Sequence, residues 1–180
     1  MLILVTGGSR SGKSRLAQEL AQQRPGPHAF VATAEALDQE MQARIEAHRH
    51  SRPSSWSVVE EPVHVPEAVA AALARARTVI LDCVTIWMSN LLLADQSFDE
   101  RRAESAAAGL ARAAATAPGA ALIVVTNEVG SGVVPDNALA RRFRDCAGRA
   151  NEVIARDADE VYLCVSGIPL RIKPKEQPNG

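Results

Sequence analysis

The chain has 180 residues, of which 47% are hydrophobic and 23% charged, values typical of a soluble globular protein with one domain. Its 20 basic and 21 acidic residues give a net charge of −1, so bulk charge does not indicate a protein that binds nucleic acid or another polyanion. No apolar run approaches the roughly 18 residues of a membrane-spanning helix, and the opening MLILV runs directly into glycines, unlike a signal peptide. The cysteines Cys83, Cys146 and Cys164 lack metal-ligand spacing and are interpreted as buried thiols of a reducing compartment. We therefore expect one cytoplasmic domain over residues 1–180.

Short apolar runs alternate with helical patterns along the chain. The predicted strands are, in order, MLILVT, HAFVAT, WSVVEE, TVILDCVT, AALIVVTNE and EVYLCVSG, with LRIK as a candidate for a short antiparallel edge strand at the C-terminal end. The predicted helices cover residues 13–23, a segment ending near 48, and residues 66–76, 99–116 and 137–156, and the apolar IWMSNLLLA follows the fourth strand. Because the strands are continuously apolar and separated by helices, we expect an α/β domain with a mostly parallel sheet and helices on both faces.

Residues 7–14, GGSRSGKS, match the phosphate-binding pattern G-x-x-x-x-G-K-[ST] between a buried strand and a helix. The glycines let successive backbone N–H groups point inward at phosphate oxygens, and the helix N-terminus faces the same anion. Lys13 is expected to reach the β- and γ-phosphates, and the Ser14 hydroxyl to ligate Mg²⁺. The predicted phosphate-binding residues are Gly7, Gly8, Ser9, Arg10, Ser11, Gly12, Lys13 and Ser14. This motif predicts a P-loop NTPase fold of the RecA-like kind.

Polar residues follow two further strands. Asp82 ends VILD and is the candidate Walker-B acid and second Mg²⁺ ligand, although an acid at that place can simply cap a helix. Thr126, Asn127 and Glu128 end the next strand, and substrate contact and loop structure are equally good interpretations of them. The base-reading pattern N-K-x-D of GTPases does not occur. Together with the size of the chain, this favours a small-molecule kinase.

The segment EMQARIEAHRHSRP, residues 40–53, carries two histidines among arginines. Leu37, Met41 and Ile45 form an apolar helical row, and three residues further on this row reaches His48. A histidine at a helix end is ordinarily a partly buried packing residue. Placed beside a triphosphate, the same imidazole would be a nucleophile, so the sequence leaves both interpretations open.

Five stretches together resemble the bifunctional adenosylcobinamide kinase/adenosylcobinamide-phosphate guanylyltransferase family of cobalamin biosynthesis. They are ILVTGGSRSGKSRLAQ, ATAEALDQEMQARIEAHRHSRPSSWSVVEEP, ILDCVTIWMSNLL, TNEVGSGVVPDNALARRFRDCAGRANEVIA and ADEVYLCVSGIPLRIK. The resemblance implies that ATP or GTP phosphorylates adenosylcobinamide. It further implies that GMP from GTP is then transferred to that phosphate through a guanylyl-histidine intermediate.

The resemblance assigns residues to these roles. The nucleophile matches His48, whereas His50 does not match it; Lys13 and Asp82 are the other catalytic candidates. Beyond the P-loop, the implied nucleotide contacts are Ala32, Thr33, Ala34, Arg49, His50, Ser51, Arg52, Glu60 and Asp82. Glu60 could equally be surface charge, and the arginines could be solvated helix or loop charges. Pro169 stands where a glycine is common in the family, which puts the final turn in question.

The implied cofactor is Mg²⁺, the implied substrates are GTP, ATP and the corrinoid, and relatives form trimers. Two other functions remain open: a monofunctional small-molecule kinase in which His48 is structural, and a nucleotide-binding module without transfer chemistry. The sequence indicates neither the preferred phosphoryl donor nor the residues that bind the corrinoid. We expect the same triphosphate site to serve both reactions, with the helix of His48 moving over it.

Overall fold

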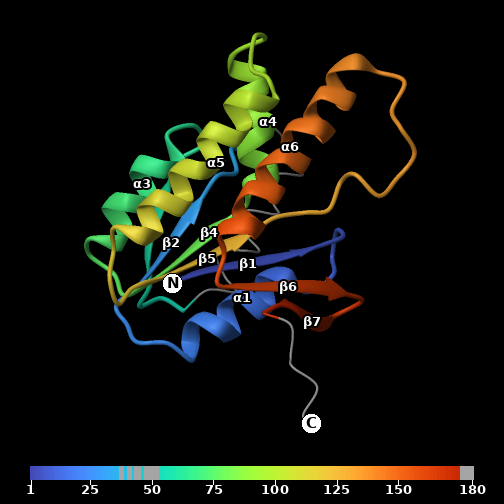
Figure 1. Cartoon of the computed structure of the whole chain (residues 1–180). Helices are drawn as coiled ribbons and strands as arrows, with labels where there is room; N and C mark the ends of the chain where they lie inside the picture. The colour runs from blue at the N-terminus through green and yellow to red at the C-terminus, as the bar shows by residue number, and fades with distance from the viewer. Residues whose placement is uncertain (37–38, 40–41, 43–45, 47–52, 175–180) are drawn as a thin grey trace.

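The structure is a computed structural model that describes residues 1–36, 39, 42, 46 and 53–174 (Figure 1). The described strands and helices follow the order that the sequence predicts, with a further helix over the apolar IWMSNLLLA. They are β1 (Leu2–Gly7), α1 (Lys13–Gln22), β2 (His28–Ala32), β3 (Ser57–Glu60), α3 (Val65–Leu73), β4 (Thr78–Asp82), α4 (Val84–Ala94), α5 (Glu100–Ala115), β5 (Ala121–Val125), α6 (Ala138–Asp157), β6 (Glu160–Val165) and β7 (Ile168–Lys173). The helix expected to end near His48 lies outside the described residues.

The fourth strand is shorter than predicted. TVILDCVT was expected to be strand throughout, but β4 ends at Asp82 and helix α4 begins at Val84. A continuously apolar run does not reveal by periodicity where a strand gives way to a helix. Here the apolar run continues because α4 is itself buried, with Trp87 and Met88 at most 1% exposed. In the described part of the chain, no helix is both long and apolar enough to cross a lipid bilayer.

The strands of the described residues form one seven-stranded sheet in the order β3-β2-β4-β5-β1-β6-β7. All neighbouring pairs are parallel except β6 and β7, which are antiparallel. The predicted antiparallel edge strand is therefore confirmed. Its turn consists of Ser166 and Gly167, with φ values of 50° and 85°, as a two-residue hairpin of the I′ kind requires. Pro169 lies within β7 opposite Cys164, so it does not disturb this turn.

Helices cover both faces of the sheet, as predicted (Figure 1). Alternate strand residues point to opposite faces, so Leu2 and Leu4 of β1 join the core under α3, α4, α5 and α6, whereas Ile3 and Val5 join the core under α1. This double burial explains why the central strands β1 and β5 are buried along their whole length, whereas the outer strands β3 and β7 are exposed. The cysteines Cys83, Cys146 and Cys164 are buried free thiols, as expected.

The parallel arrangement brings the carboxyl ends of six strands, β1 to β6, to one edge of the sheet. The P-loop follows β1 at this edge, Asp82 ends β4, and residues 126–128 follow β5, which lies between β1 and β4. Strand pairing also sets Glu60 opposite Ala32, and Ala32 opposite Asp82. The fold therefore collects residues from distant parts of the sequence along one line, which we call the carboxyl edge.

Candidate functional site

The P-loop at the start of the carboxyl edge has a backbone that only glycine permits at its two ends. Gly7 has φ of 144° and Gly12 has φ of 94°, both in the region that favours glycine. A Cβ atom on Gly7 would lie 2.3 Å from the carbonyl oxygen of Cys164. The loop also packs on the final hairpin, because Gly167 donates its N–H to the Ser11 carbonyl at 3.0 Å. The turn after β6 thus supports the loop from outside.

Replacing Gly7 with alanine should lower the free energy of unfolding by about 1–3 kcal/mol, since the new methyl group would overlap buried backbone. Nucleotide binding should weaken with it. Gly148→Ala is the matched control, because Gly148 is an exposed residue of helix α6 and a Cβ atom added there would meet no other atom within 4 Å. That control should gain about 0.5–1 kcal/mol. Urea denaturation of both variants measures the two effects, and an unchanged stability of Gly7→Ala would contradict this description of the loop.

Lys13 is folded back over the P-loop. Its Nζ donates to the Gly8 carbonyl at 2.5 Å and to the Ser11 hydroxyl at 3.4 Å, and the residue is 7% exposed. Burial lowers the pKa of Lys13, and the nearby negative charge of Asp82 opposes this shift. Helix α1 begins at Lys13, so its free N–H groups face the same loop. A buried ammonium and a helix N-terminus that converge on one loop make this loop the candidate for binding an anion.

Ser14, at the end of the P-loop, contacts Asp82, at the end of β4. The Ser14 hydroxyl donates to Oδ2 of Asp82 at 3.0 Å. Both ligating atoms are hard oxygens, and two neighbouring ligands of an octahedral Mg²⁺ ion at 2.0–2.1 Å stand about 3 Å apart. The residues present therefore fit Mg²⁺. Among the described residues there is no cluster of three or more His, Cys, Asp or Glu side chains that could hold a metal on its own. A magnesium ion here would need phosphate or water oxygens as further ligands.

Thr33 joins β2 to β4 at this edge. Its hydroxyl donates to the Cys83 carbonyl at 2.8 Å and accepts from the Cys83 N–H at 2.9 Å, and the residue is fully buried. Its own N–H donates to the Asp82 carbonyl at 3.1 Å. Thr33 thus fixes the backbone of Asp82 and Cys83 at the end of β4. Contacts of Ala32, Thr33 and Ala34 with nucleotide stay predictions.

A buried polar network fixes the residues that follow β5. The Thr85 and Thr126 hydroxyls are 3.2 Å apart, and Thr126 donates to Oδ1 of Asn151 at 2.7 Å. Asn127 donates its backbone N–H to the Thr85 hydroxyl at 2.8 Å and accepts a bond from the Asn151 amide at its carbonyl, at 3.2 Å. Thr126 and Asn127 therefore serve the structure of the edge. Thr85 and Asn151, which the sequence analysis did not single out, hold that structure in place.

The remaining predicted contacts divide into two groups. Glu60 ends β3 in an exposed position, on the strand-pairing row of Ala32 and Asp82. At the usual strand spacing it lies two strands, or about 10 Å, along the edge from Asp82. The predicted site residues His48, Arg49, His50, Ser51 and Arg52 lie outside the described residues, as do Leu37, Met41, Arg44 and Ile45.

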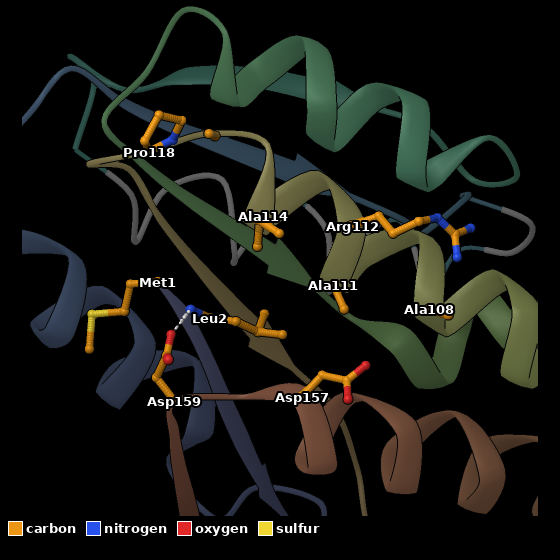
Figure 2. A pocket seen from close by; sticks show the side chains of 11 residues that line it. Met1, Leu2, Ala108, Ala111, Arg112, Ala114, Pro118, Asp157 and Asp159 are labelled. Carbon is orange, nitrogen blue, oxygen red and sulfur yellow. Dashed lines mark hydrogen bonds between the residues drawn. The ribbon is translucent and has the colours of Figure 1, made fainter.

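A pocket between the ends of α5 and α6 lies at the opposite edge of the sheet (Figure 2). It is lined by Met1 and Leu2 at the start of β1, by Asp159 just before β6, and by alanines of α5 such as Ala108 and Ala111. In Figure 2 the Leu2 N–H faces Asp159, whose Oδ2 accepts it at 2.7 Å. None of the predicted phosphate-binding residues lines this pocket, so the candidate site is the carboxyl edge.

Comparison with known proteins covers nearly the whole chain. A family model described as cobinamide kinase / cobinamide phosphate guanyltransferase matches residues 3–172. The bifunctional adenosylcobalamin biosynthesis protein CobU of Salmonella typhimurium is 44% identical over 183 residues, covering 96% of this chain and 100% of the relative. The bifunctional adenosylcobalamin biosynthesis protein CobP of Pseudomonas aeruginosa is 39% identical over 170 residues, covering 94% and 96%.

Solved structures resemble the chain in fold. An ATPase from the type III secretion system of pathogenic bacteria superposes with a TM-score of 0.57 at 16% identity, covering 90% of this chain and 51% of that one. At this identity the likeness concerns the fold alone. Together with the P-loop and the sheet order, it confirms the predicted P-loop NTPase fold.

Proposed function

Because the chain belongs to the cobinamide kinase / cobinamide phosphate guanyltransferase family, we propose that it performs two transfers on one corrinoid. In the first, ATP or GTP phosphorylates the aminopropanol hydroxyl of adenosylcobinamide. In the second, GMP from GTP is transferred to the new phosphate, which gives adenosylcobinamide-GDP and pyrophosphate. The observation that carries this proposal is the P-loop at the carboxyl edge, in which Lys13 bonds the Gly8 carbonyl and Ser14 bonds Asp82.

In the kinase reaction, the P-loop and Lys13 bind the phosphate chain. The Lys13 ammonium stands where negative charge grows on the β–γ bridging oxygen and the γ-phosphate, so it stabilises the transition state more than the ground state. The Ser14 hydroxyl and the Asp82 carboxylate would hold Mg²⁺. When bound, that ion would neutralise charge on the β- and γ-phosphates. Burial of Lys13 strengthens its interaction with phosphate, because less water competes for the ammonium.

In the guanylyl transfer, His48 is the proposed nucleophile. A neutral imidazole nitrogen forms a bond to the α-phosphorus of GTP while the bond to the α–β bridging oxygen breaks and pyrophosphate leaves. The cobinamide phosphate then attacks the same phosphorus and releases the imidazole. Two displacements thereby replace one direct encounter of two polyanions. Histidine suits this role at neutral pH, since its reference pKa of about 6.5 leaves most of the imidazole unprotonated.

The course of β2 supports placing His48 near the triphosphate. β2 ends at Ala32, which pairs with Asp82, so the chain that continues toward residue 48 leaves from the carboxyl edge. Glu60 at the end of β3 stands on the same row. We propose that the nucleoside lies along this row, from the P-loop toward β3. The predicted cationic residues Arg49 and Arg52 would stabilise charge on the α-phosphate and on the leaving pyrophosphate.

Association between copies is also part of the proposal. Edge strand β7 exposes Ile168, Leu170 and Ile172 on alternate positions, with exposed fractions of 71%, 57% and 44%. β7 is the last strand of the sheet that the described residues form, and an apolar row on such an edge strand is a surface that contact with another chain would cover. We propose a homotrimer, and a solution mass three times that of the chain, measured by light scattering, would support it.

The proposed function is tested with adenosylcobinamide and GTP labelled at either the α- or the γ-phosphate. With γ-labelled GTP, the label should enter the corrinoid in the first reaction. With α-labelled GTP, the label should appear in the final product and the released pyrophosphate should be unlabelled. A monofunctional kinase would transfer the γ-label and never the α-label. A nucleotide-binding module would transfer neither label while still binding GTP. Either of these two outcomes would refute the bifunctional assignment.

A further inference from the structure

The structure assigns a catalytic role to Glu128: we propose that its carboxylate accepts the proton of the acceptor hydroxyl during phosphoryl transfer. The inference rests on the proposed function, in which that hydroxyl belongs to the corrinoid. Glu128 follows β5, the strand that separates β1 with its P-loop from β4 with Asp82. It therefore stands between the two parts of the phosphate site and belongs to neither sequence motif.

The backbone around Glu128 is unusually well fixed for an exposed residue. Its own N–H donates to the Gly7 carbonyl at 3.1 Å. The preceding Asn127 is bonded at both its N–H and its carbonyl, to Thr85 and Asn151 respectively. Three segments, from β1, α4 and α6, thus hold the chain where it leaves β5 toward α6 (Figure 1). Such support is what a catalytic group needs, because a misplaced base loses most of its effect.

The side chain of Glu128 is oriented by a buried hydroxyl. Thr6, which is 6% exposed, donates its Oγ1–H to Oε1 of Glu128 at 2.6 Å, a short charge-assisted bond. Of the donors in the described part of the chain, this hydroxyl alone bonds the carboxylate. One oxygen is therefore occupied and fixes the plane of the group, and Oε2 remains to receive a substrate proton.

Glu128 lies beside the γ-phosphate end of the site. The Lys13 ammonium, which contacts β- and γ-phosphates in P-loop proteins, bonds the Gly8 carbonyl. The backbone N–H of Glu128 donates to the Gly7 carbonyl, and its carboxylate accepts from the hydroxyl of Thr6, the residue before Gly7. The carboxylate and the Lys13 ammonium are thus bonded to residues of the same short segment, at Thr6 and Gly8. Asp82 lies on the other side of β5 and accepts a hydrogen bond from Ser14. Of these two acids, Glu128 is therefore the one that can accept the proton of the acceptor hydroxyl.

The step is a simple in-line transfer. The acceptor oxygen forms a bond to the γ-phosphorus while the bond from that phosphorus to the β–γ bridging oxygen breaks, and the electron pair leaves with the nucleoside diphosphate. The hydroxyl proton passes to Oε2 of Glu128 and from there to solvent. Guanylyl transfer needs no such base, because neither the imidazole nitrogen nor a phosphate dianion carries a proton that must be removed. Glu128 should therefore matter for one reaction and not for the other.

Two other roles for Glu128 predict different behaviour. If the carboxylate only clamped β5 to β1, its replacement would disturb the P-loop and impair both reactions alike. If it ligated Mg²⁺, both reactions would again fall and would require more magnesium. General bases typically contribute 10²–10⁴-fold to a rate. The separation between the two reactions is therefore the informative measurement.

The test compares wild type, Glu128→Gln, Glu128→Asp and the control Glu67→Gln, an exposed glutamate in the first turn of α3. Glutamine can still accept the Thr6 bond, so the fold should be preserved. We expect the phosphorylation of adenosylcobinamide by Glu128→Gln to fall at least about 100-fold. Guanylylation of the enzyme by α-labelled GTP, and transfer to ready-made adenosylcobinamide phosphate, should stay at the wild-type rate. Aspartate should restore part of the kinase activity, and Glu67→Gln should change neither reaction.

Equal losses in both reactions, or no loss in the kinase reaction, would overturn the assignment. A raised magnesium requirement of Glu128→Gln in both reactions would do so as well. Failure of the proposed function is distinguishable, since then the wild-type protein itself would not phosphorylate adenosylcobinamide.

Discussion

Replacing Lys13 with alanine should reduce both the kinase and the guanylyl-transfer activities by on the order of 10³-fold, the size of loss seen when a charge-stabilising group is removed from an active site. Both reactions fall together because both bind a triphosphate in the loop that Lys13 covers. The ammonium that now bonds the Gly8 carbonyl would be missing, and no other cation in the P-loop is buried among the described residues. Steady-state rates with adenosylcobinamide and with adenosylcobinamide phosphate measure the two losses.

Lys173→Ala is the matched control for this variant. The Lys173 ammonium also donates hydrogen bonds to backbone carbonyls, those of Ala155 and Arg156 near the end of α6. Lys173 itself belongs to β7, away from the P-loop motif. Its loss should affect stability and leave both activities near wild type. Retention of either activity by Lys13→Ala, in a variant shown to be folded by circular dichroism, would mean that this reaction binds its nucleotide elsewhere.

Replacing His48 with asparagine should abolish guanylyl transfer and leave the kinase activity largely intact. Asparagine is of similar size and polarity, but its amide nitrogen is not a nucleophile, so no phosphoramidate can form. The measurement is the retention of acid-labile α-label on the protein after incubation with α-labelled GTP, alongside the rate of γ-label transfer to adenosylcobinamide. Wild type should retain the label and His48→Asn should not.

His50→Asn is the control that separates the two histidines. It removes an imidazole two residues away and should leave the protein labelled. Loss of label in His50→Asn but not in His48→Asn would move the nucleophile to the other histidine. Survival of both activities in His48→Asn would show that the mechanism through a guanylyl-histidine is wrong.

The position of the P-loop could be predicted from the sequence because its residues are consecutive. The P-loop needs glycines, a lysine and a hydroxyl within eight residues, and the structure confirms its position between β1 and α1. Asp82 was identified from its place at the end of an apolar strand, and it does meet Ser14. The continuous apolar runs of the central strands likewise predicted that helices cover both faces of the sheet.

The neighbours of the site were not predictable, because they depend on the order of strands. Nothing local indicates that β5 lies between β1 and β4, and it is this order that puts Glu128 against Thr6 and Gly7. The bonds of the Thr33 hydroxyl to the backbone of Cys83 likewise depend on the pairing of β2 with β4, which no local pattern indicates. A signal for such residues existed: Thr6 and Thr33 are polar side chains at the ends of apolar strands, where a buried hydroxyl must find partners.

If one triphosphate site serves both reactions, an analogue that occupies the P-loop should inhibit both of them. The ATP analogue with a β,γ-imido bridge cannot donate its γ-phosphoryl group but should occupy the P-loop. It should inhibit phosphorylation of adenosylcobinamide and guanylyl transfer to adenosylcobinamide phosphate competitively with the triphosphate, and with the same inhibition constant. Inhibition of the kinase reaction alone, with guanylyl transfer unaffected at saturating analogue, would contradict a single shared site.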